Sequence, residues 1–276
     1  MKFLKRKDLK NSFFELGIKK GDIVHVQSDI RRIGPVDAPL TFDGQCGFYF
    51  ETLKEVVGDQ GTISCCTAFE NYGRYGATFE REKSPSLTDT LSEYIRLRKG
   101  SIRSIHPIVS VTSVGKKAKE ISGGSHYEGF SYNSPWGELH RENAKILTLG
   151  MNADQGGTTF FHYIEHLYGV PYVYVKIFDH PVFSKGKKIK GPFSMSVRYL
   201  DYNIENTPVK VKNSMLKAKL ARQCKIGRSY SWCANTKDIE SHMMKLLDKD
   251  RWVMLKSPPK FEKGKIPFDS ITGDLK

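Results

Sequence analysis

Few features of this sequence are typical of secreted, membrane-spanning or metal-cluster proteins. The 276 residues include five cysteines at irregular spacing, and no two of them form a C-x-x-C pair. That pattern argues against a disulfide framework and a structural zinc cluster. We expect the adjacent Cys65 and Cys66 to be buried strand thiols, with a nucleophilic role as the less favoured alternative. No window approaches the roughly 18 uninterrupted apolar residues that a membrane span requires.

Signals for secretion and for common cofactors are also missing. The first residues, MKFLKRKDLKNSFFELG, lack the apolar region and cleavage site of a secretory signal, so we expect a cytoplasmic protein. The absence of G-x-G-x-x-G and G-x-x-x-x-G-K-[ST] argues against Rossmann dehydrogenases and P-loop kinases. No zinc finger, ribonucleoprotein aromatic motif or heptad pattern is present, so a nucleic-acid partner is not expected.

Positive charge is what the sequence has in excess. Lys and Arg number 44 against 30 Asp and Glu, which gives a net charge of +14. Such an excess favours anionic partners such as nucleic acid, membrane surfaces or phosphorylated small molecules. Surface solvation accounts for part of the excess, and a phosphate-binding site would account for some of the rest.

Strands and helices are predicted to alternate along the chain, which indicates an α/β protein. The predicted strands are 23–27, 62–69, 105–115, 146–151, 172–178 and 194–202. Residues 71–86 are predicted to form an irregular loop, and 205–252 to be helical in two pieces. We expect one domain over 1–276, with two tightly packed lobes divided near residue 179 as the alternative, and a loosely packed tail at 257–276.

A short predicted helix at 159–168 contains the pentapeptide HYIEH. Positions three and four apart share a helix face, so His162, Glu165 and His166 are expected on its polar side. One interpretation is an amphipathic helix with a solvated face. A second is the H-x-x-E-H pattern of inverted zinc metallopeptidases, although Gly169 and Pro171 keep the helix short and no third ligand stands out.

A third interpretation makes His162 a general base. An amine nucleophile is protonated near neutral pH, and an imidazole with a pKa of about 6.5 suits the removal of its proton. A carboxylate is needed to hold the tautomer of the ring. The Gly-Gly-Thr-Thr entry to the helix adds N–H groups and hydroxyls that could receive an anionic intermediate.

Four segments together carry a more specific signal than any one of them. In chain order they are GDIVHVQSDIRRIG, RSIHPIVSVTSVG, SPWGELHRENAKILTLGM and GTTFFHYIEHLYGVP. This order resembles the aminoglycoside 3-N-acetyltransferase family, which shows His-x-Ser, Arg-Ser-x-His-Pro-x-x-Ser, Ser-Pro-x-Gly and Thr-x-x-His-x-x-Glu motifs. The resemblance covers about residues 10–178.

The resemblance implies an N-acyltransferase that uses acetyl-CoA or another short acyl-CoA and no metal. It also implies an α/β fold with a mixed central sheet flanked by helices, distinct from the GNAT fold. His162 is the expected base, Glu165 is the motif's acid, and Thr158 or Thr159 lies near the thioester carbonyl. Asp201 is our candidate for a further carboxylate that orients the base. Five motif residues are expected to line the CoA groove, with the first of them on a CoA phosphate: Arg103, Ser104, His106, Ser110 and Ser28.

Two positions depart from the simplest form of this pattern. The first motif reads His25-Val-Gln-Ser28, one residue longer before its serine, which leaves the role of Ser28 open. His106 could be mistaken for the base, but its neighbour Pro107 and its strand context favour a groove or packing role.

The acceptor is predicted from charge and from the loop 71–86, which the family places near the acceptor. A chain of charge +14 would repel a polycationic aminoglycoside, whereas Arg74 and Arg81 would attract a diphosphate and Tyr72 and Tyr75 could stack on a base or sugar. We therefore predict a nucleotide-linked amino sugar of the dTDP type, used in surface polysaccharide such as lipopolysaccharide O-antigen. One alternative is an aminoglycoside acceptor. Another is that the basic residues lie mostly outside the cleft and carry no information about the substrate. A homodimer is left open.

The predicted mechanism is direct transfer in a ternary complex. The amine attacks the thioester while His162 accepts its proton, and donors at the start of the 159–168 helix hold the oxyanion. A zinc-dependent hydrolase and a non-catalytic nucleic-acid binder are the alternatives from other classes.

Overall fold

A seven-stranded sheet forms the centre of the computed structural model, which describes residues 3–151, 157–199, 202 and 204–262. Its strand order is β11-β12-β6-β1-β2-β5-β4. The three middle strands are parallel and the outer four are antiparallel to their inner neighbours, so the sheet is mixed. In chain order the strands are β1 (Ile23–Ser28), β2 (Thr62–Cys66), β4 (Ile102–Arg103), β5 (Val111–Gly115), β6 (Lys145–Leu149), β11 (Ala221–Ile226) and β12 (Ser229–Asn235).

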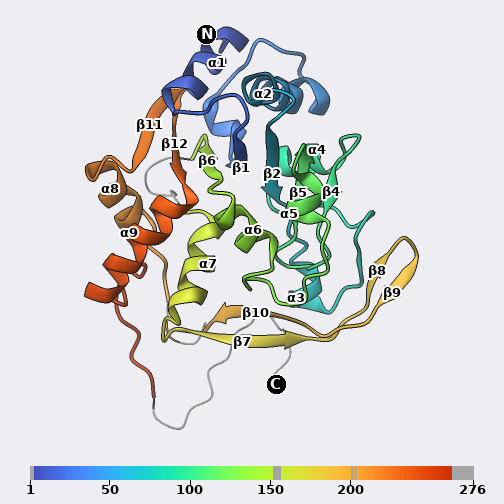
Figure 1. The fold of residues 1–276 in the computed structure, drawn as a ribbon, viewed down its shortest axis with the longest axis vertical. Coiled ribbons are helices and arrows are strands. Elements are labelled where there is room, and N and C mark those ends of the chain that lie inside the picture. Colours follow the sequence, from blue (N-terminus) through green and yellow to red (C-terminus); the bar gives the residue numbers. More distant parts are fainter. Residues whose placement is uncertain (1–2, 152–156, 200–201, 203, 263–276) are drawn as a thin grey trace.

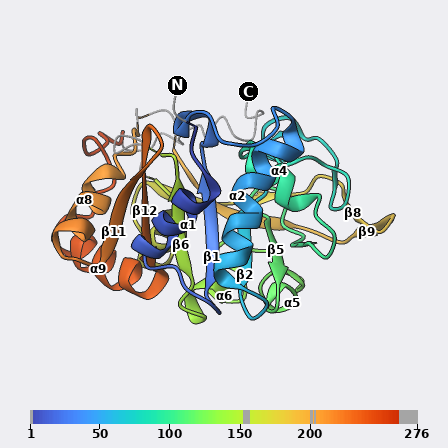
Figure 2. The ribbon, with the colours of Figure 1, turned by 90° about the horizontal axis from the view of Figure 1, so that it is seen from above.

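Helices cover both faces of this sheet. In Figure 1, α1 and α2 lie above the strands, and α6 and α7 lie below them. Figure 2 looks down on α1 and α2, with β1 beneath them. Alternate strand residues point to opposite faces, so Val24 and Val26 join one hydrophobic core while the His25 ring contacts Trp136 in the other. The helices are α1 (Arg6–Glu15), α2 (Phe42–Val57), α3 (Asn71–Tyr75), α4 (Thr90–Arg96), α5 (Ala118–Ser122), α6 (Pro135–Arg141), α7 (Thr159–Tyr168), α8 (Val209–Lys217), α9 (Thr236–Lys249) and the 3-10 helix η1 (Ile30–Ile33).

A second, two-stranded sheet lies across the far side of α6 and α7 (Figure 1). It pairs β7 (Val173–Phe178) with β10 (Phe193–Arg198) in antiparallel register. Backbone hydrogen bonds attach residues 127–129 to it, from Gly129 N to Ser194 O at 2.7 Å and from Ser194 N to Tyr127 O at 2.8 Å. A further small sheet combines β3 (Phe79–Glu80), β8 (Val182–Ser184) and β9 (Lys187–Ile189).

The C-terminal part differs most from the prediction. Residues 205–252 were predicted to be helical in two pieces, but the β11–β12 hairpin separates α8 from α9. The hairpin turns at Gly227, whose φ of 58° lies in the left-handed region. Because β12 pairs with β6, this hairpin extends the central sheet. Helix α6 was not predicted, although Ser134 caps its N-terminus and Pro135 occupies its first turn.

The cysteines are buried, as predicted for Cys65 and Cys66. Burial raises the pKa of the Cys66 thiol to about 11 and raises that of Cys65 as well, so both are poor nucleophiles at neutral pH. None of the helices in the described part of the chain is long and apolar enough to cross a membrane. The division into one domain or two lobes stays a prediction, and of the predicted tail only 257–262 belong to the described residues.

Candidate active site

Helix α7 carries the central residues of the site, and local sequence signals define both of its ends. The Thr158 side chain accepts a hydrogen bond from Phe160 N, which caps the first turn. Gly169 ends the helix in the left-handed conformation, with φ of 73°. Phe161 is buried and stacks on Trp232 with ring centroids 6.1 Å apart. This packing anchors the apolar face of α7 on the central sheet and leaves His162 half-exposed on another face.

A buried carboxylate holds the His162 ring. His162 Nδ1 lies 2.5 Å from Glu165 Oε2, and the Tyr172 hydroxyl donates to Glu165 Oε1 at 2.6 Å. The Glu165 side chain is only 2% exposed, whereas that of His162 is 37% exposed. Burial, together with the Glu165 charge, raises the pKa of Tyr172, which keeps the phenol a donor. Since Glu165 occupies Nδ1, the other ring nitrogen, Nε2, is left for chemistry.

The orienting acid therefore comes from the same helix as the base. Glu165 was predicted as the motif's acid on the polar face of the helix, and the structure places it in the interior instead. Asp201, our candidate for a further orienting carboxylate, lies outside the described residues. Tyr172 was not predicted as a site residue.

His162 opens into a cavity of about 140 Å³ between α7 and the β7–β10 sheet. Five apolar side chains form part of its wall: Val109, Phe130, Val173, Met195 and Val197. Six polar residues complete it: Thr159, His162, Glu165, His166, Ser196 and Arg198. We call this space the imidazole cavity. Polar groups that converge on apolar walls are typical of a site that orients a bound reactant.

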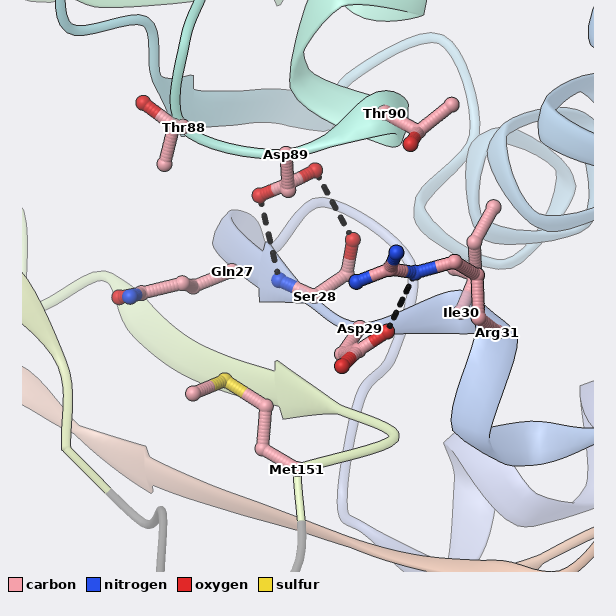
Figure 3. A pocket seen from close by; sticks show the side chains of 9 residues that line it. All are labelled: Gln27, Ser28, Asp29, Ile30, Arg31, Thr88, Asp89, Thr90 and Met151. Carbon is pink, nitrogen blue, oxygen red and sulfur yellow. Dashed lines mark hydrogen bonds and ion pairs between the residues drawn. The ribbon is translucent and has the colours of Figure 1, made fainter.

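A second cavity, of about 310 Å³, lies at the carboxyl end of β1 (Figure 3). Ligands of open α/β sheets commonly bind at this end of parallel strands. Asp89 caps α4 and accepts hydrogen bonds from Ser28, at 3.0 Å to Oγ and 3.4 Å to the backbone N. Arg31 pairs with Asp29 at 3.3 Å, and its side chain is 84% exposed. This strand-end cavity is lined by Gln27, Ser28, Asp29, Ile30, Arg31, Thr88, Asp89, Thr90 and Met151.

One hydrogen bond joins the walls of the two cavities. Thr159 N, from the imidazole cavity, donates to Gln27 Oε1, from the strand-end cavity, at 3.2 Å. The two spaces therefore adjoin at the N-terminus of α7. Thr159 N and Phe160 N are both engaged, so the helix start offers fewer free backbone donors than predicted. The Gln27 amide group, whose oxygen accepts this bond, keeps its NH2 as a donor. Gln27 was not among the predicted site residues.

The predicted CoA residues of the second motif lie in the interior. Arg103 is 5% exposed, and its guanidinium donates to the carbonyl oxygens of Thr67 and Ser84, each at 2.5 Å. The Ser110 hydroxyl donates to Thr67 O at 2.6 Å, and Ser104 Oγ accepts from Val111 N at 3.0 Å. In this conformation these groups are occupied, and none of them lines either cavity. Of the five predicted groove residues, only Ser28 does so.

His106 is a buried packing residue, which agrees with the alternative that we favoured over a catalytic base. Its Nε2 lies 3.0 Å from Ser194 O and must donate, because a carbonyl only accepts. Its Nδ1 then accepts from Val109 N at 3.3 Å, so the ring is neutral. Burial lowers the pKa of His106 to about 4.

We expect acid to destabilise the fold through His106. The unfolded chain takes up a proton at a pKa of about 6.5, whereas folded His106 does so only near 4. Stability is therefore lost as the pH falls below 6.5, by about 2 kcal/mol at pH 5 from this residue alone. Urea unfolding of the wild type and of His106→Gln at pH 7 and pH 5 measures this. The free energy of unfolding should fall less between pH 7 and pH 5 in the variant than in the wild type, by about that amount. An equal fall in both proteins would contradict the lowered pKa of His106.

The predicted acceptor loop lies away from both cavities. Tyr72 is fully buried, and its hydroxyl donates to His180 O at 3.1 Å. Arg74 pairs with Glu70 at 3.0 Å, and Arg81 donates to the carbonyl oxygen of Arg103. Tyr75 is 77% exposed. None of these four predicted residues lines either cavity.

The histidines of HYIEH have separate partners. His162 Nδ1 is held by Glu165, and His166 Nδ1 lies 2.6 Å from Ser196 Oγ. Across the described ranges, no three His, Cys, Asp or Glu side chains gather in a way that could hold a metal ion. The geometry thus pairs each imidazole with a hydrogen-bonding side chain of its own.

Comparison with known proteins identifies relatives of one kind. Aminoglycoside N(3)-acetyltransferase IX of Micromonospora chalcea is 24% identical over 82% of this chain and 87% of its own. Aminoglycoside N(3)-acetyltransferase III of Salmonella sp is 23% identical over 88% of this chain and 91% of its own.

Solved structures have the same fold. The structure "AAC-IIIb binary with CoASH" aligns with a TM-score of 0.76 at 21% identity, over 94% of this chain and 100% of that one. "AAC-VIa bound to Sisomicin" aligns with a TM-score of 0.75 at 20% identity, over 90% and 98%. These likenesses confirm the predicted α/β fold with a mixed central sheet. The family model described as aminoglycoside 3-N-acetyltransferase matches residues 25–248. The chain therefore belongs to the aminoglycoside 3-N-acetyltransferase family, a family of CoA-dependent acyltransferases.

Proposed function

We propose that this protein transfers an acetyl group from acetyl-CoA to an amine of an aminoglycoside-type acceptor, with His162 as general base. The observation that carries the proposal is the His162 ring, fixed by buried Glu165 and open to the imidazole cavity. The names of the two relatives compared above, both aminoglycoside N(3)-acetyltransferases, favour this acceptor over the nucleotide-linked amino sugar predicted from charge.

The transfer requires one proton to move from nitrogen to sulfur. As the acceptor amine attacks the thioester carbonyl, a C–N bond forms and His162 Nε2 takes a proton from the nitrogen. Glu165 stabilises the imidazolium that results. The C–S bond then breaks, and the leaving thiolate takes the proton back from His162. One ring therefore serves as base and then as acid, and no covalent acyl-enzyme is needed.

Two side-chain donors are placed for the oxyanion of the tetrahedral intermediate. Thr159 is part of the wall of the imidazole cavity, where its hydroxyl also interacts with the Cys66 thiol, and Gln27, with its NH2 group, is part of the adjoining strand-end cavity. Donors that are already oriented stabilise developing charge without reorganisation. The Gln27–Thr159 hydrogen bond holds these two residues together at the junction.

The strand-end cavity suits the thioester arm of acetyl-CoA. Its volume of about 310 Å³ fits an extended chain rather than a whole nucleotide, and it reaches the start of α7 through Gln27. Arg31 on its wall and the neighbouring Arg32 are cations beside this opening, suited to the CoA phosphates. Asp29 accepts from both arginines and fixes their guanidinium groups.

A nucleotide-linked amino sugar is the second candidate acceptor. The net charge of +14 favours it, because a cationic surface attracts a diphosphate. The loop residues offered for its recognition, however, lie outside both cavities. Support for the nucleotide-linked amino sugar therefore comes from long-range electrostatic attraction and not from contacts in the cavities.

A thiol assay for released CoA tests the proposal. Wild-type protein is incubated with acetyl-CoA and, separately, with a deoxystreptamine aminoglycoside, a dTDP-linked amino sugar and the same sugar nucleotide without its amine. Amine-dependent CoA release with the aminoglycoside is the expected result. Release only with the dTDP-linked amino sugar supports the second candidate, and failure of every amine tried refutes the acyltransferase assignment.

A further inference from the structure

We propose that His166 is a second acid–base residue of this site and removes the proton that the acceptor ammonium must lose before its nitrogen can attack. The inference rests on the proposed N-acetyl transfer and deepens it. His162 removes the proton lost during attack, and His166 removes the one lost beforehand.

The chemistry of an alkyl amine calls for two proton acceptors. Alkyl ammonium groups resemble the lysine side chain, with a pKa of about 10, so nearly every acceptor molecule carries the extra proton at pH 7. The ammonium has no lone pair and cannot attack a carbonyl. Apolar residues line much of the imidazole cavity, and the desolvated cation needs a proton acceptor within it.

His166 has the position that this step needs. It follows His162 by four residues, so the two rings lie one turn apart on the same side of α7, and both line the imidazole cavity. Its Nδ1 lies 2.6 Å from the hydroxyl of Ser196 on β10. When Nδ1 carries the ring hydrogen and donates it to this hydroxyl, Nε2 keeps a lone pair that can accept a proton.

The buried carboxyl group of Glu128 interacts electrostatically with His166. Glu128 Oε2 accepts from Phe130 N at 3.0 Å. Glu128 Oε1 is buried and makes no hydrogen bond within the described part of the chain. The backbone bonds to Ser194 on either side fix this residue against β10.

The Glu128 carboxylate and the His166 ring affect one another electrostatically. Burial raises the pKa of Glu128, and the positive charge of protonated His166 lowers it. The interaction is reciprocal, so an ionised Glu128 stabilises the imidazolium that forms when His166 takes a proton.

The other charged groups around the cavity partly oppose each other. Arg198 lines the cavity from β10 and disfavours a second cation, although its Nη1 donates to Ile204 O at 3.2 Å. Glu165 on α7 carries a compensating negative charge but is already engaged by His162 and Tyr172. Glu128 is therefore the carboxyl group that can respond to a positive charge on His166.

The proton balance closes with this second base. The acceptor R-NH3⁺ gives one proton to His166 Nε2 and becomes R-NH2. The nitrogen attacks, His162 takes the second proton, and the thiolate of CoA receives it. His166 then releases its proton to water, so R-NH3⁺ and acetyl-CoA give R-NH-acetyl, CoA thiol and one H⁺.

The test compares two amines with His166→Gln. One acceptor is the deoxystreptamine aminoglycoside, whose reacting group is an alkyl amine, and the other is its alkoxyamine analogue, which is already neutral at pH 7. We expect kcat/KM at pH 7 to fall by about 10- to 100-fold for the alkyl amine and by less than about 2-fold for the alkoxyamine. In the variant, kcat/KM for the alkyl amine should then rise about tenfold per pH unit towards the pKa of the amine, while the wild type is flat over that range.

A matched control comes from α9. His242 Nε2 lies 2.8 Å from Ser214 Oγ, so it is also an imidazole paired with a serine hydroxyl, but it lines neither cavity. His242→Gln should leave both rates unchanged. If His166→Gln lowers kcat/KM equally for the two acceptors, or for neither of them, the proposal is overturned. If the wild type transfers acetyl to neither amine, the proposed function itself fails.

Discussion

Replacing His162 by glutamine is expected to lower kcat for acetyl transfer by about two to four orders of magnitude. The variant keeps a polar group of similar reach but cannot take a proton from the attacking nitrogen. The alkoxyamine should lose as much rate as the alkyl amine, because both must shed a proton during attack. Steady-state rates of CoA release with each acceptor measure this, and KM for acetyl-CoA should change little.

Loss of fold must be separated from loss of chemistry in this variant. The His162 side chain is partly exposed, so its replacement removes little packing. Buried Glu165 loses one partner but keeps Tyr172, and the glutamine amide can donate to the carboxylate in place of the ring. A thermal unfolding midpoint close to that of the wild type is therefore expected. A folded variant that retains more than about a tenth of the rate would exclude His162 as the base.

The sequence predicted α7 well because the signals that define it are local. Thr158 and Gly169 bound the helix, and the i, i+3, i+4 spacing places His162 on a different face from Phe161. The interior position of Glu165 was not predictable from that spacing, because it depends on Tyr172.

The strand-end part of the site depends on contacts between distant segments. Gln27 meets Thr159 across more than a hundred residues, and no local pattern indicates that contact. The β11–β12 hairpin was missed for a related reason. Helical propensity on either side of residues 221–235 dominated the prediction, whereas pairing of β12 with β6 decides the outcome.

The Arg-Ser-x-His-Pro motif shows a different limit of prediction from sequence. A motif shows that certain residues occur together, but their role depends on burial. Arg103 was expected to contact a CoA phosphate, yet its guanidinium is buried over the Phe79 ring, 4.7 Å from the ring centroid. Its carbonyl acceptors come from segments at residues 67, 81 and 84. In this position it links these three segments.

Removal of that guanidinium is expected to have the largest effect on stability. Arg103→Ala should lower the free energy of unfolding by about 3–5 kcal/mol, because several buried carbonyl groups lose their donor and cannot reach water. Arg103→Lys keeps the positive charge, but one ammonium cannot donate in all of these directions, so a smaller loss is expected. Urea unfolding measures both. At a temperature where the variants are folded, KM for acetyl-CoA should equal that of the wild type. A raised KM for acetyl-CoA with unchanged stability would instead return Arg103 to the CoA site.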